Sequence, residues 1–305
     1  MIGALDLECY DYRKGSATLC RATEGTVEER LPPRIRVRQG APLELPHIMI
    51  LIDDPEKTVI EPLREQCKDA APIYNFTLMQ GGGAATGYRI PEDEGGRIAD
   101  ALDALKGDAE HPLLYAVGDG NHSLATAKAI YTQLKEELGE EALTHPARYC
   151  LVELVNIHSP ALEFEPIHRV VFDTDLSALT AFLAQAGLEQ GADGEQVIEV
   201  VRKGEHIPYS FTKTTSALAV DTLQNALDAY LATHPGRVDY IHGSDVVEQL
   251  TAEGDAIGFI LPGMEKGMLF PAVTADGALP RKTFSMGHAA DKRFYLECRK
   301  IGKEG

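Results

Sequence analysis

The chain has 305 residues, 44% of them hydrophobic and 25% charged, a composition typical of a soluble globular protein with room for a large core and two lobes. Its formal net charge of −18 argues against general binding to nucleic-acid phosphates, which needs a basic face, and its five scattered cysteines argue against a zinc site or disulfide scaffold. No apolar run is long enough to span a membrane and no secretory leader follows Met1, so the sequence predicts a cytoplasmic protein with no membrane partner.

The first forty residues carry the pattern of short strands. Alternating apolar residues predict strands over residues 4–10 and 17–20, with Lys14-Gly15-Ser16 as a hairpin turn between them. After two prolines, Arg34, Arg36 and Arg38 alternate, which on a strand would place all three side chains on one face. Such a row of charges is typical of a solvated edge strand that resists pairing.

A glycine-rich turn at the centre of the chain joins a predicted strand to a predicted helix. The apolar run 113–117 has the length and composition of a buried strand, and it breaks at Gly118-Asp119-Gly120. Apolar residues then recur at helical spacing over residues 124–138, and Gly139 follows where a helix commonly ends.

This turn has the features of an anion site. A tight glycine turn that enters a helix leaves unpaired N–H groups and the positive end of the helix dipole at one spot. Asp119 adds a metal ligand or proton acceptor there, and His122 adds a donor that can change charge near neutral pH. The alternative is an ordinary strand-to-helix turn, in which Asn121 or Ser123 caps the helix and His122 is solvated.

Two groups in the second half of the chain are further candidates for phosphate contact. His168 and Arg169 adjoin a β-branched run; they would bind phosphate by charge and by the arginine fork, or else form a surface pair. Arg281, Lys282 and Thr283 lie in a predicted loop and concentrate donors in an acidic chain. For that loop the alternative is a solvated turn.

The order of elements changes near Phe172. Beyond it the sequence predicts a helix, two strands and another helix, over residues 176–186, 196–201, 206–212 and 221–232. We therefore expect an α/β (α+β) fold with mixed sheets in two lobes and a polar cleft between them. Residues 1–172 would carry the turn and residues 173–305 would contribute the loop.

Several segments together resemble the DUF1015 family. They are GDGNHSLATAK at the turn, LIDDPEKTVIEPL at residues 51–63, PIHRVV at 166–171, VDYIHGSDVVEQL at 238–250 and LPRKTFSMG at 279–287. The first is similar to the DGHHR-type signature of that family, which in turn resembles the phosphate-binding turn of ParB/sulfiredoxin-like domains. The resemblance implies a ParB/sulfiredoxin-like core in which Gly118, Gly120, Asn121 and Ser123 contact phosphate.

The sequence departs from the family pattern in two ways. The first His and the closing Arg of the signature are Asn121 and Ser123 here, so the phosphate role would fall to backbone N–H groups, His122, and Lys282 or Arg281. Family members also carry about a further domain's worth of sequence before the part that matches Met1–Tyr10, so we expect a preceding segment to be missing.

The turn and the resemblance together predict a nucleotide- or polyphosphate-binding protein. One ParB-like branch phosphorylates free serine, which implies transfer from ATP, ADP or pyrophosphate to a small hydroxylated substrate, serine first. Asp119 would hold Mg²⁺ or act as general base, His122 would donate to phosphate, and Arg169, Arg281 and Lys282 would stabilise charge.

Two other functions stay open. One is a ParB-like regulator that binds a nucleotide without transfer, and the other is a catalytically silent protein. The sequence is compatible with a homo-oligomer.

Overall fold

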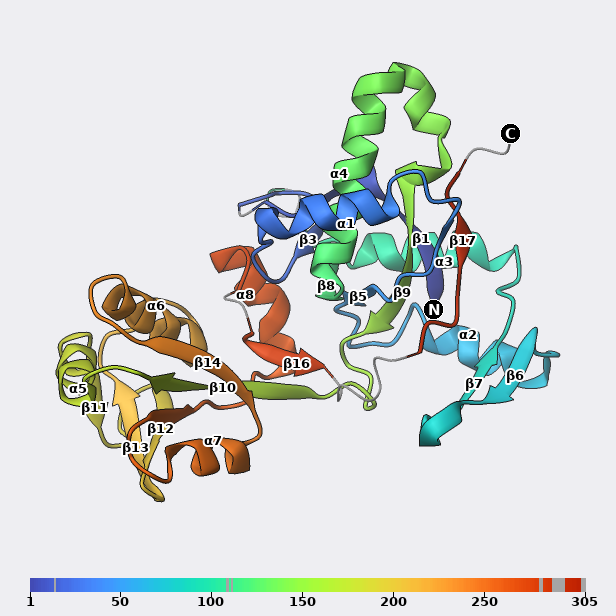
Figure 1. Cartoon of the computed structure of the whole chain (residues 1–305). Coiled ribbons are helices and arrows are strands. Elements are labelled where there is room, and N and C mark those ends of the chain that lie inside the picture. The colour runs from blue at the N-terminus through green and yellow to red at the C-terminus, as the bar shows by residue number, and fades with distance from the viewer. Residues whose placement is uncertain (14, 108–109, 111, 280–281, 287–293, 303–305) are drawn as a thin grey trace. The chain divides into compact units, whose positions relative to one another are not determined.

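The computed structural model describes residues 1–13, 15–107, 110, 112–279, 282–286 and 294–302 (Figure 1). The chain divides into two compact units, one formed by Met1–Leu162 with Gly287–Gly305 and the other by Glu163–Met286. Helices pack on sheets in both units, and the sheet of the first unit is mixed, so the predicted α+β class is confirmed.

The first unit is built on a six-stranded sheet with the order β1-β9-β5-β8-β3-β2. In its interior, β8 lies antiparallel to β5 and parallel to β3, so β3 and β8 end at the same edge of the sheet. Two-stranded sheets of β4 with β17 and of β6 with β7 accompany it. The strands are β1 (Ile2–Asp6), β2 (Tyr10–Asp11), β3 (Cys20–Ala22), β4 (Leu43–Glu44), β5 (Met49–Ile52), β6 (Tyr74–Thr77), β7 (Ala84–Gly87), β8 (Tyr115–Asp119), β9 (Tyr149–Asn156) and β17 (Arg299–Lys300).

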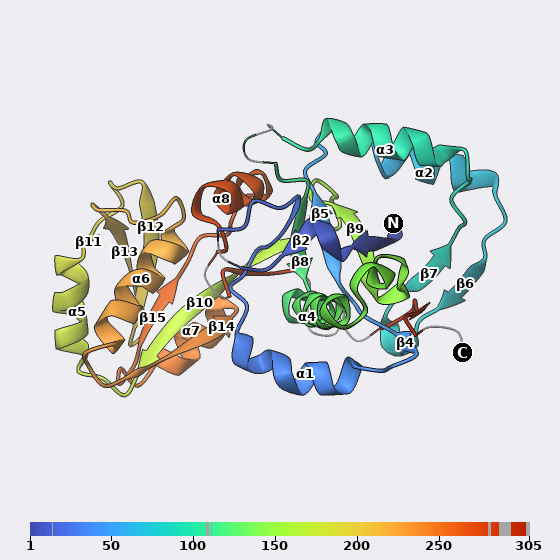
Figure 2. The same ribbon diagram turned by 90° about the horizontal axis from the view of Figure 1, so that it is seen from above.

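Helices cover the six-stranded sheet on both sides. Helices α1 (Leu31–Arg38) and α4 (Asn121–Leu138) lie on one side, and α2 (Glu61–Gln66) and α3 (Glu94–Ala104) lie on the other (Figure 2). Along α4, Leu124, Ala127 and Tyr131 are buried in one core with strand residues such as Ile50 and Val117. Their spacing of three and four residues is the helical period that the sequence predicts for this segment.

Two expectations about the first forty residues are wrong. Residues 31–38 form helix α1 instead of a strand, because Pro32 and Pro33 lie in the first turn, where a missing N–H breaks no helical hydrogen bond. Strands β2 and β3 pair in parallel, so the segment between them is no hairpin turn. Lys14 of that expected turn lies outside the described residues.

The second unit is built on an antiparallel sheet with the order β11-β13-β12-β15-β10-β14, and β16 pairs with the first part of β10. Adjacent residues of β10 point to opposite faces: Val171 packs with α5 and α6, and Val170 packs with Val247 of α7. The elements are β10 (Phe164–Phe172), α5 (Leu176–Gln185), β11 (Leu188–Gln190), β12 (Gln196–Arg202), β13 (Glu205–Phe211), α6 (Ala219–Leu231), β14 (Arg237–His242), α7 (Ser244–Thr251), β15 (Ile257–Ile260), α8 (Leu269–Asp276) and β16 (Phe284–Met286).

The division between the units lies before β10, whereas the sequence suggested a boundary after it at residue 172. The reason is pairing: β10 bonds to β14, β15 and β16, all in the second unit. Within the described ranges, none of the helices combines the length and apolar character that a membrane span requires.

A buried carboxylate joins separate segments of the first unit. The Glu44 side chain in β4 is 1% exposed and accepts hydrogen bonds from Arg38 at the end of α1 and from Arg299 Nε of β17, the latter at 2.8 Å. The backbone N–H of Leu151 in β9 donates to the same carboxylate at 2.9 Å. This carboxylate therefore links a helix end, a sheet strand and the returning C-terminal segment.

We expect Glu44→Gln to lower the free energy of unfolding by about 3 kcal/mol, because it leaves two largely buried guanidinium groups without their shared anion. Urea unfolding followed by circular dichroism measures the change. The exposed Glu56→Gln is the control and should change stability by less than about 0.5 kcal/mol. Equal stability of the two variants would contradict the importance of this contact.

Candidate functional site

The central turn has the strand, glycine and helix order that the sequence predicts. Strand β8 ends at Asp119, Gly120 has φ +87° and ψ +20°, and α4 begins at Asn121. A Cβ atom on residue 120 would lie 3.0 Å from the His47 carbonyl oxygen and 3.0 Å from Ile48 Cγ1. Both the left-handed backbone and the lack of space therefore require glycine at this position.

The pairing of β8 with β5 is irregular just before the turn. Met49 pairs with Asp119 and Ile50 pairs with Val117, so Gly118 is an extra residue without a partner in β5. A bulge of this kind bends a strand and redirects the side chains that follow it. It therefore sets how Asp119 and the start of α4 leave the sheet.

In the part of the chain that the structure describes, no side-chain cap hydrogen bond is made at the N-cap of α4, which is Gly120. The first intrahelical hydrogen bond runs from Leu124 N–H to Gly120 O at 2.9 Å, so helix geometry gives the N–H groups of residues 121–123 no intrahelical acceptor. The alternative in which Asn121 or Ser123 caps the helix is thereby excluded. These N–H groups and the positive end of the helix dipole face the same region, which favours an anion.

The acid and the imidazole of the turn both contact backbone N–H groups. Asp119 Oδ1 accepts a hydrogen bond from Gly120 N–H at 2.7 Å. His122 Nε2 accepts one from Val27 N–H at 3.3 Å, so its ring donates through Nδ1 in this arrangement. Residues Gly118, Asp119, Gly120, His122 and Ser123 are half-buried, and Asn121 is buried.

Residues 23–27 lie beside the turn, which the sequence pattern did not predict. This segment follows β3, whose carboxyl end lies beside that of β8. Thr23 Oγ1 donates to Val117 O at 2.6 Å, and Val27 contacts His122 as described above. The run Thr-Glu-Gly-Thr directly after a strand was the available signal, because polar residues around a glycine often mark a functional strand end.

Two buried oxygens at this edge of the sheet lack hydrogen-bond partners among the described residues. They are Oγ1 of Thr26, in the segment after β3, and Oδ1 of Asn121, whose residue is 7% exposed. A buried polar atom without a partner costs about 1–3 kcal/mol, so such atoms are commonly satisfied by a ligand or water. Both lie on segments that meet at the start of α4.

Two residues of the second unit that the sequence predicts to contact phosphate, His168 and Arg169, are buried and make hydrogen bonds within that unit. Arg169 is fully buried: Nε donates to Gln224 Oε1 at 2.8 Å, Nη1 donates to Ile167 O at 2.6 Å, and the guanidinium lies 4.6 Å from the Tyr240 ring centroid. The expected surface pair is therefore absent at this strand. Because helices cover both faces of the sheet, opposite orientations bury both Arg169 and its neighbour His168.

His168 is 4% exposed, and its Nδ1 accepts the Leu261 N–H at 3.1 Å. Burial, aided by the positive charges of Arg169 and His242, lowers the pKa of His168 below its ordinary value. The ring is therefore neutral at physiological pH and supplies no charge for phosphate.

The loop residues differ in exposure. Lys282 is exposed with φ +61°, and Thr283 is 5% exposed. Arg281 lies outside the described residues. These residues belong to the second unit, and the glycine turn belongs to the first.

Comparison with known proteins identifies the family. Residues 1–230 match the family described as "Protein of unknown function (DUF1015)". The chain belongs to the DUF1015 family. None of the curated proteins compared with the sequence matches it.

Solved structures with the DUF1015 chain's fold include nucleotide complexes. A point mutant of a free serine kinase in complex with AMP has a TM-score of 0.53 at 12% identity, and the match covers 98% of this chain and 91% of that one. A free serine kinase mutant in complex with ADP has a TM-score of 0.51 at 12% identity, and the match covers 98% of this chain and 91% of that one. SbnI with a C-terminal truncation, from Staphylococcus aureus, has a TM-score of 0.50 at 11% identity, and the match covers 94% of this chain and 83% of that one. At these identities the likeness establishes a shared fold.

In this DUF1015 chain, we expect Gly120→Ala to lower the free energy of unfolding by more than about 2 kcal/mol, because it adds a backbone penalty and a close contact with the His47 carbonyl. Gly15→Ala is the matched control: its φ is +82°, but nothing lies within 4 Å of the added Cβ. Thermal unfolding compares the two. A Gly120→Ala loss no larger than the Gly15→Ala loss would contradict the close approach.

We expect His168 to make the stability of the second unit depend on pH. Its pKa is lowered in the folded state, so the unfolded chain takes up the proton first and stability falls as the pH drops below about 6.5. His168→Asn should flatten this decline, because an amide oxygen can still accept the Leu261 N–H but does not titrate. The difference between the melting temperatures at about pH 7.5 and about pH 5.5 measures this decline, and the exposed His234→Asn is the control. Equal slopes in all three proteins would refute the assignment.

Proposed function

We propose that the chain binds a nucleotide at the glycine turn and transfers a phosphoryl group to the hydroxyl of a small acceptor, free serine being the first candidate. The observation that carries the proposal is the uncapped start of α4, flanked by the unpartnered buried oxygens of Thr26 and Asn121. Among the described residues, no side-chain cap hydrogen bond is made at the N-cap position of α4, which is Gly120.

The turn supplies complementary groups for the two halves of a nucleotide. Backbone N–H groups at the start of α4 would accept the phosphates, as helix N-termini commonly do. Asn121 Oδ1 is an acceptor, so it suits a donor such as a ribose hydroxyl rather than a phosphate oxygen. A molecule that carries phosphates next to hydroxyl groups satisfies both requirements.

Magnesium ion fits the donor set as part of a nucleotide complex. Mg²⁺ commonly uses one or two carboxylates together with substrate phosphates and water, and Asp119 provides one carboxylate beside the anion-favouring turn. No cluster of three or more metal-ligating side chains occurs among the described residues. The ion would neutralise phosphate charge, and Asp119 would alternatively take the proton from the acceptor hydroxyl.

The fold supports this proposal. Structures of the shared fold carry the name free serine kinase and hold AMP or ADP. Charge stabilisation by Arg281 and Lys282 stays a prediction from the sequence, because both belong to the second unit and the turn belongs to the first. Arg169 and His168 make internal hydrogen bonds, so in this proposal they support the second unit.

A regulatory protein that binds nucleotide without transfer is the second candidate. The specific observation that favours it is the turn itself, which carries no lysine or arginine between Gly118 and Ser123 to neutralise a transferring phosphoryl group. The net charge of −18 argues against DNA as the partner of such a regulator.

We expect Asn121→Ala to weaken nucleotide binding about tenfold while leaving stability unchanged or higher, because it removes an unpartnered buried oxygen that a ligand would satisfy. Isothermal titration with AMP, ADP and ATP, with and without Mg²⁺, measures affinity, and thermal unfolding measures stability. The exposed Asn75→Ala is the control. Absence of binding by the unmodified chain to every nucleotide would contradict both candidate functions.

Mass spectrometry of phosphoserine separates the two candidates. The chain is incubated with serine, Mg²⁺ and ATP, ADP or pyrophosphate, and Asp119→Asn serves as the inactive comparison. Phosphoserine made by the unmodified chain supports transfer. Nucleotide binding without phosphoserine from any donor selects the regulator instead.

A further inference from the structure

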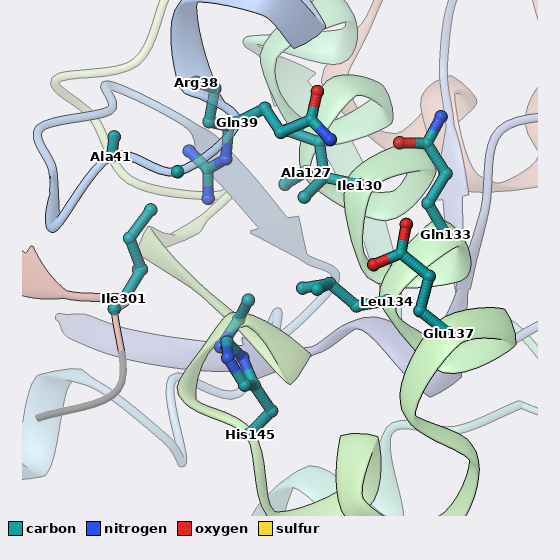
Figure 3. A pocket seen from close by; sticks show the side chains of 13 residues that line it. Arg38, Gln39, Ala41, Ala127, Ile130, Gln133, Leu134, Glu137, His145 and Ile301 are labelled. Carbon is teal, nitrogen blue, oxygen red and sulfur yellow. The ribbon is translucent and has the colours of Figure 1, made fainter. Parts of the chain in front are cut away.

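A second site of different character lies in the first unit, at the other half of α4. A cavity of about 260 Å³ is bounded by α4, by the end of α1 and by the segment around Ile301 (Figure 3). Ala127, Ile130 and Leu134 of α4 and Ile301 give it an apolar wall. None of the glycine-turn residues 118–123 lines it.

Arg38 brings a charged group into this apolar cavity. Its side chain is 16% exposed, and Figure 3 shows the guanidinium directed into the space between the labelled residues. Hydrogen bonds to Glu44 and Cys150 both use Nη2. Among the described residues, Nε and Nη1 of Arg38 have no acceptor, although a guanidinium with this little exposure normally has its donors satisfied.

The charges around Arg38 leave an excess of one positive charge. Glu44 is the buried anion, and both Arg38 and Arg299 donate to it. Arg299 also donates to the carbonyls of Pro146 and Tyr149, so it turns away from the cavity that Arg38 faces. A singly charged anion that accepts a hydrogen bond from either Nε or Nη1 of Arg38 would balance the group.

The other polar side chains of the cavity favour a ligand with a second, cationic end. Glu137 is exposed at the opposite side of the opening, where Figure 3 shows its carboxylate across from Arg38. His145 also lines the cavity, and its Nδ1 accepts the Ala147 N–H at 3.1 Å. A carboxylate at Arg38 and an ammonium at Glu137 would meet groups of opposite charge.

We propose that this cavity binds a small monocarboxylate with an apolar body, and that Glu137 favours a free apolar amino acid. The volume lies just below the roughly 300 Å³ at which pockets for drug-sized ligands begin, so it suits a metabolite-sized molecule. The apolar wall would contact the ligand's side chain, and an Arg38 N–H that does not bind Glu44 would donate a charge-assisted hydrogen bond to the carboxylate. This site is separate from the glycine turn and stands whether or not the chain is a kinase.

Isothermal titration with leucine, methionine and phenylalanine tests the proposal, with leucinamide as the analogue that lacks a carboxylate. We expect leucine to bind at least about tenfold more tightly than leucinamide. The acid 4-methylpentanoate, which lacks the ammonium group, separates the sources: binding equal to that of leucine assigns the site to monocarboxylates in general, and weaker binding assigns it to amino acids. No heat or thermal shift with any carboxylate at millimolar concentration overturns the proposal.

Two variants place the binding in this cavity. Arg38→Gln should weaken leucine binding at least about tenfold, while Arg36→Gln, an equal charge change at an exposed position of α1, should not. Because Arg38 also contacts Glu44, Ala41→Phe is the second variant: it fills the cavity and leaves that ion pair intact, and exposed Ala104→Phe is its control. Leucine binding that survives both Arg38→Gln and Ala41→Phe would refute the assignment.

Discussion

The candidate phosphate site depends on a close approach of two backbone segments. Gly120 passes so near the His47 carbonyl and Ile48 that no side chain fits, and this approach holds the start of α4 against the strand edge. The bulge at Gly118 and the left-handed conformation of Gly120 let β8 turn directly into the helix. The helix N–H groups and the segment after β3 thereby face one region. The proposed ligand capture at this place would therefore depend first on backbone geometry and only second on side-chain identity.

In the second unit, polar residues that the sequence assigned to phosphate binding instead stabilise the interior. Sheet residues of β10 are covered by helices on both faces, so the His168–Arg169 pair becomes internal. Arg169 is satisfied by Gln224, backbone carbonyls and the Tyr240 ring, which compensates the cost of burying a guanidinium. Polar residues in a family motif can thus serve packing as well as chemistry.

Local patterns predicted the turn well and distant contacts poorly. The β8 to α4 transition was predictable because glycine freedom and helical spacing are both local properties. The helix at Leu31–Arg38 was mistaken for a strand because alternating arginines mimic period two, whereas prolines at a helix start fit either element. The role of residues 23–27 could not be read from the sequence, since their contact with His122 depends on β3 lying parallel to β8. The burial of Arg169 could not be predicted from the sequence either, because it depends on helices that pack on both faces of the sheet.

The path of the chain has a consequence for synthesis on the ribosome. Glu44 and Arg299 are 255 residues apart, and the whole second unit is made between them. In a nascent chain, Glu44 can therefore bind Arg38 but lacks Arg299 until the last segment emerges from the exit tunnel. Domains commonly fold in the order in which they are made, but the first unit begins first and is completed last. Premature release or proteolytic trimming would therefore affect the earliest-made half of the protein most.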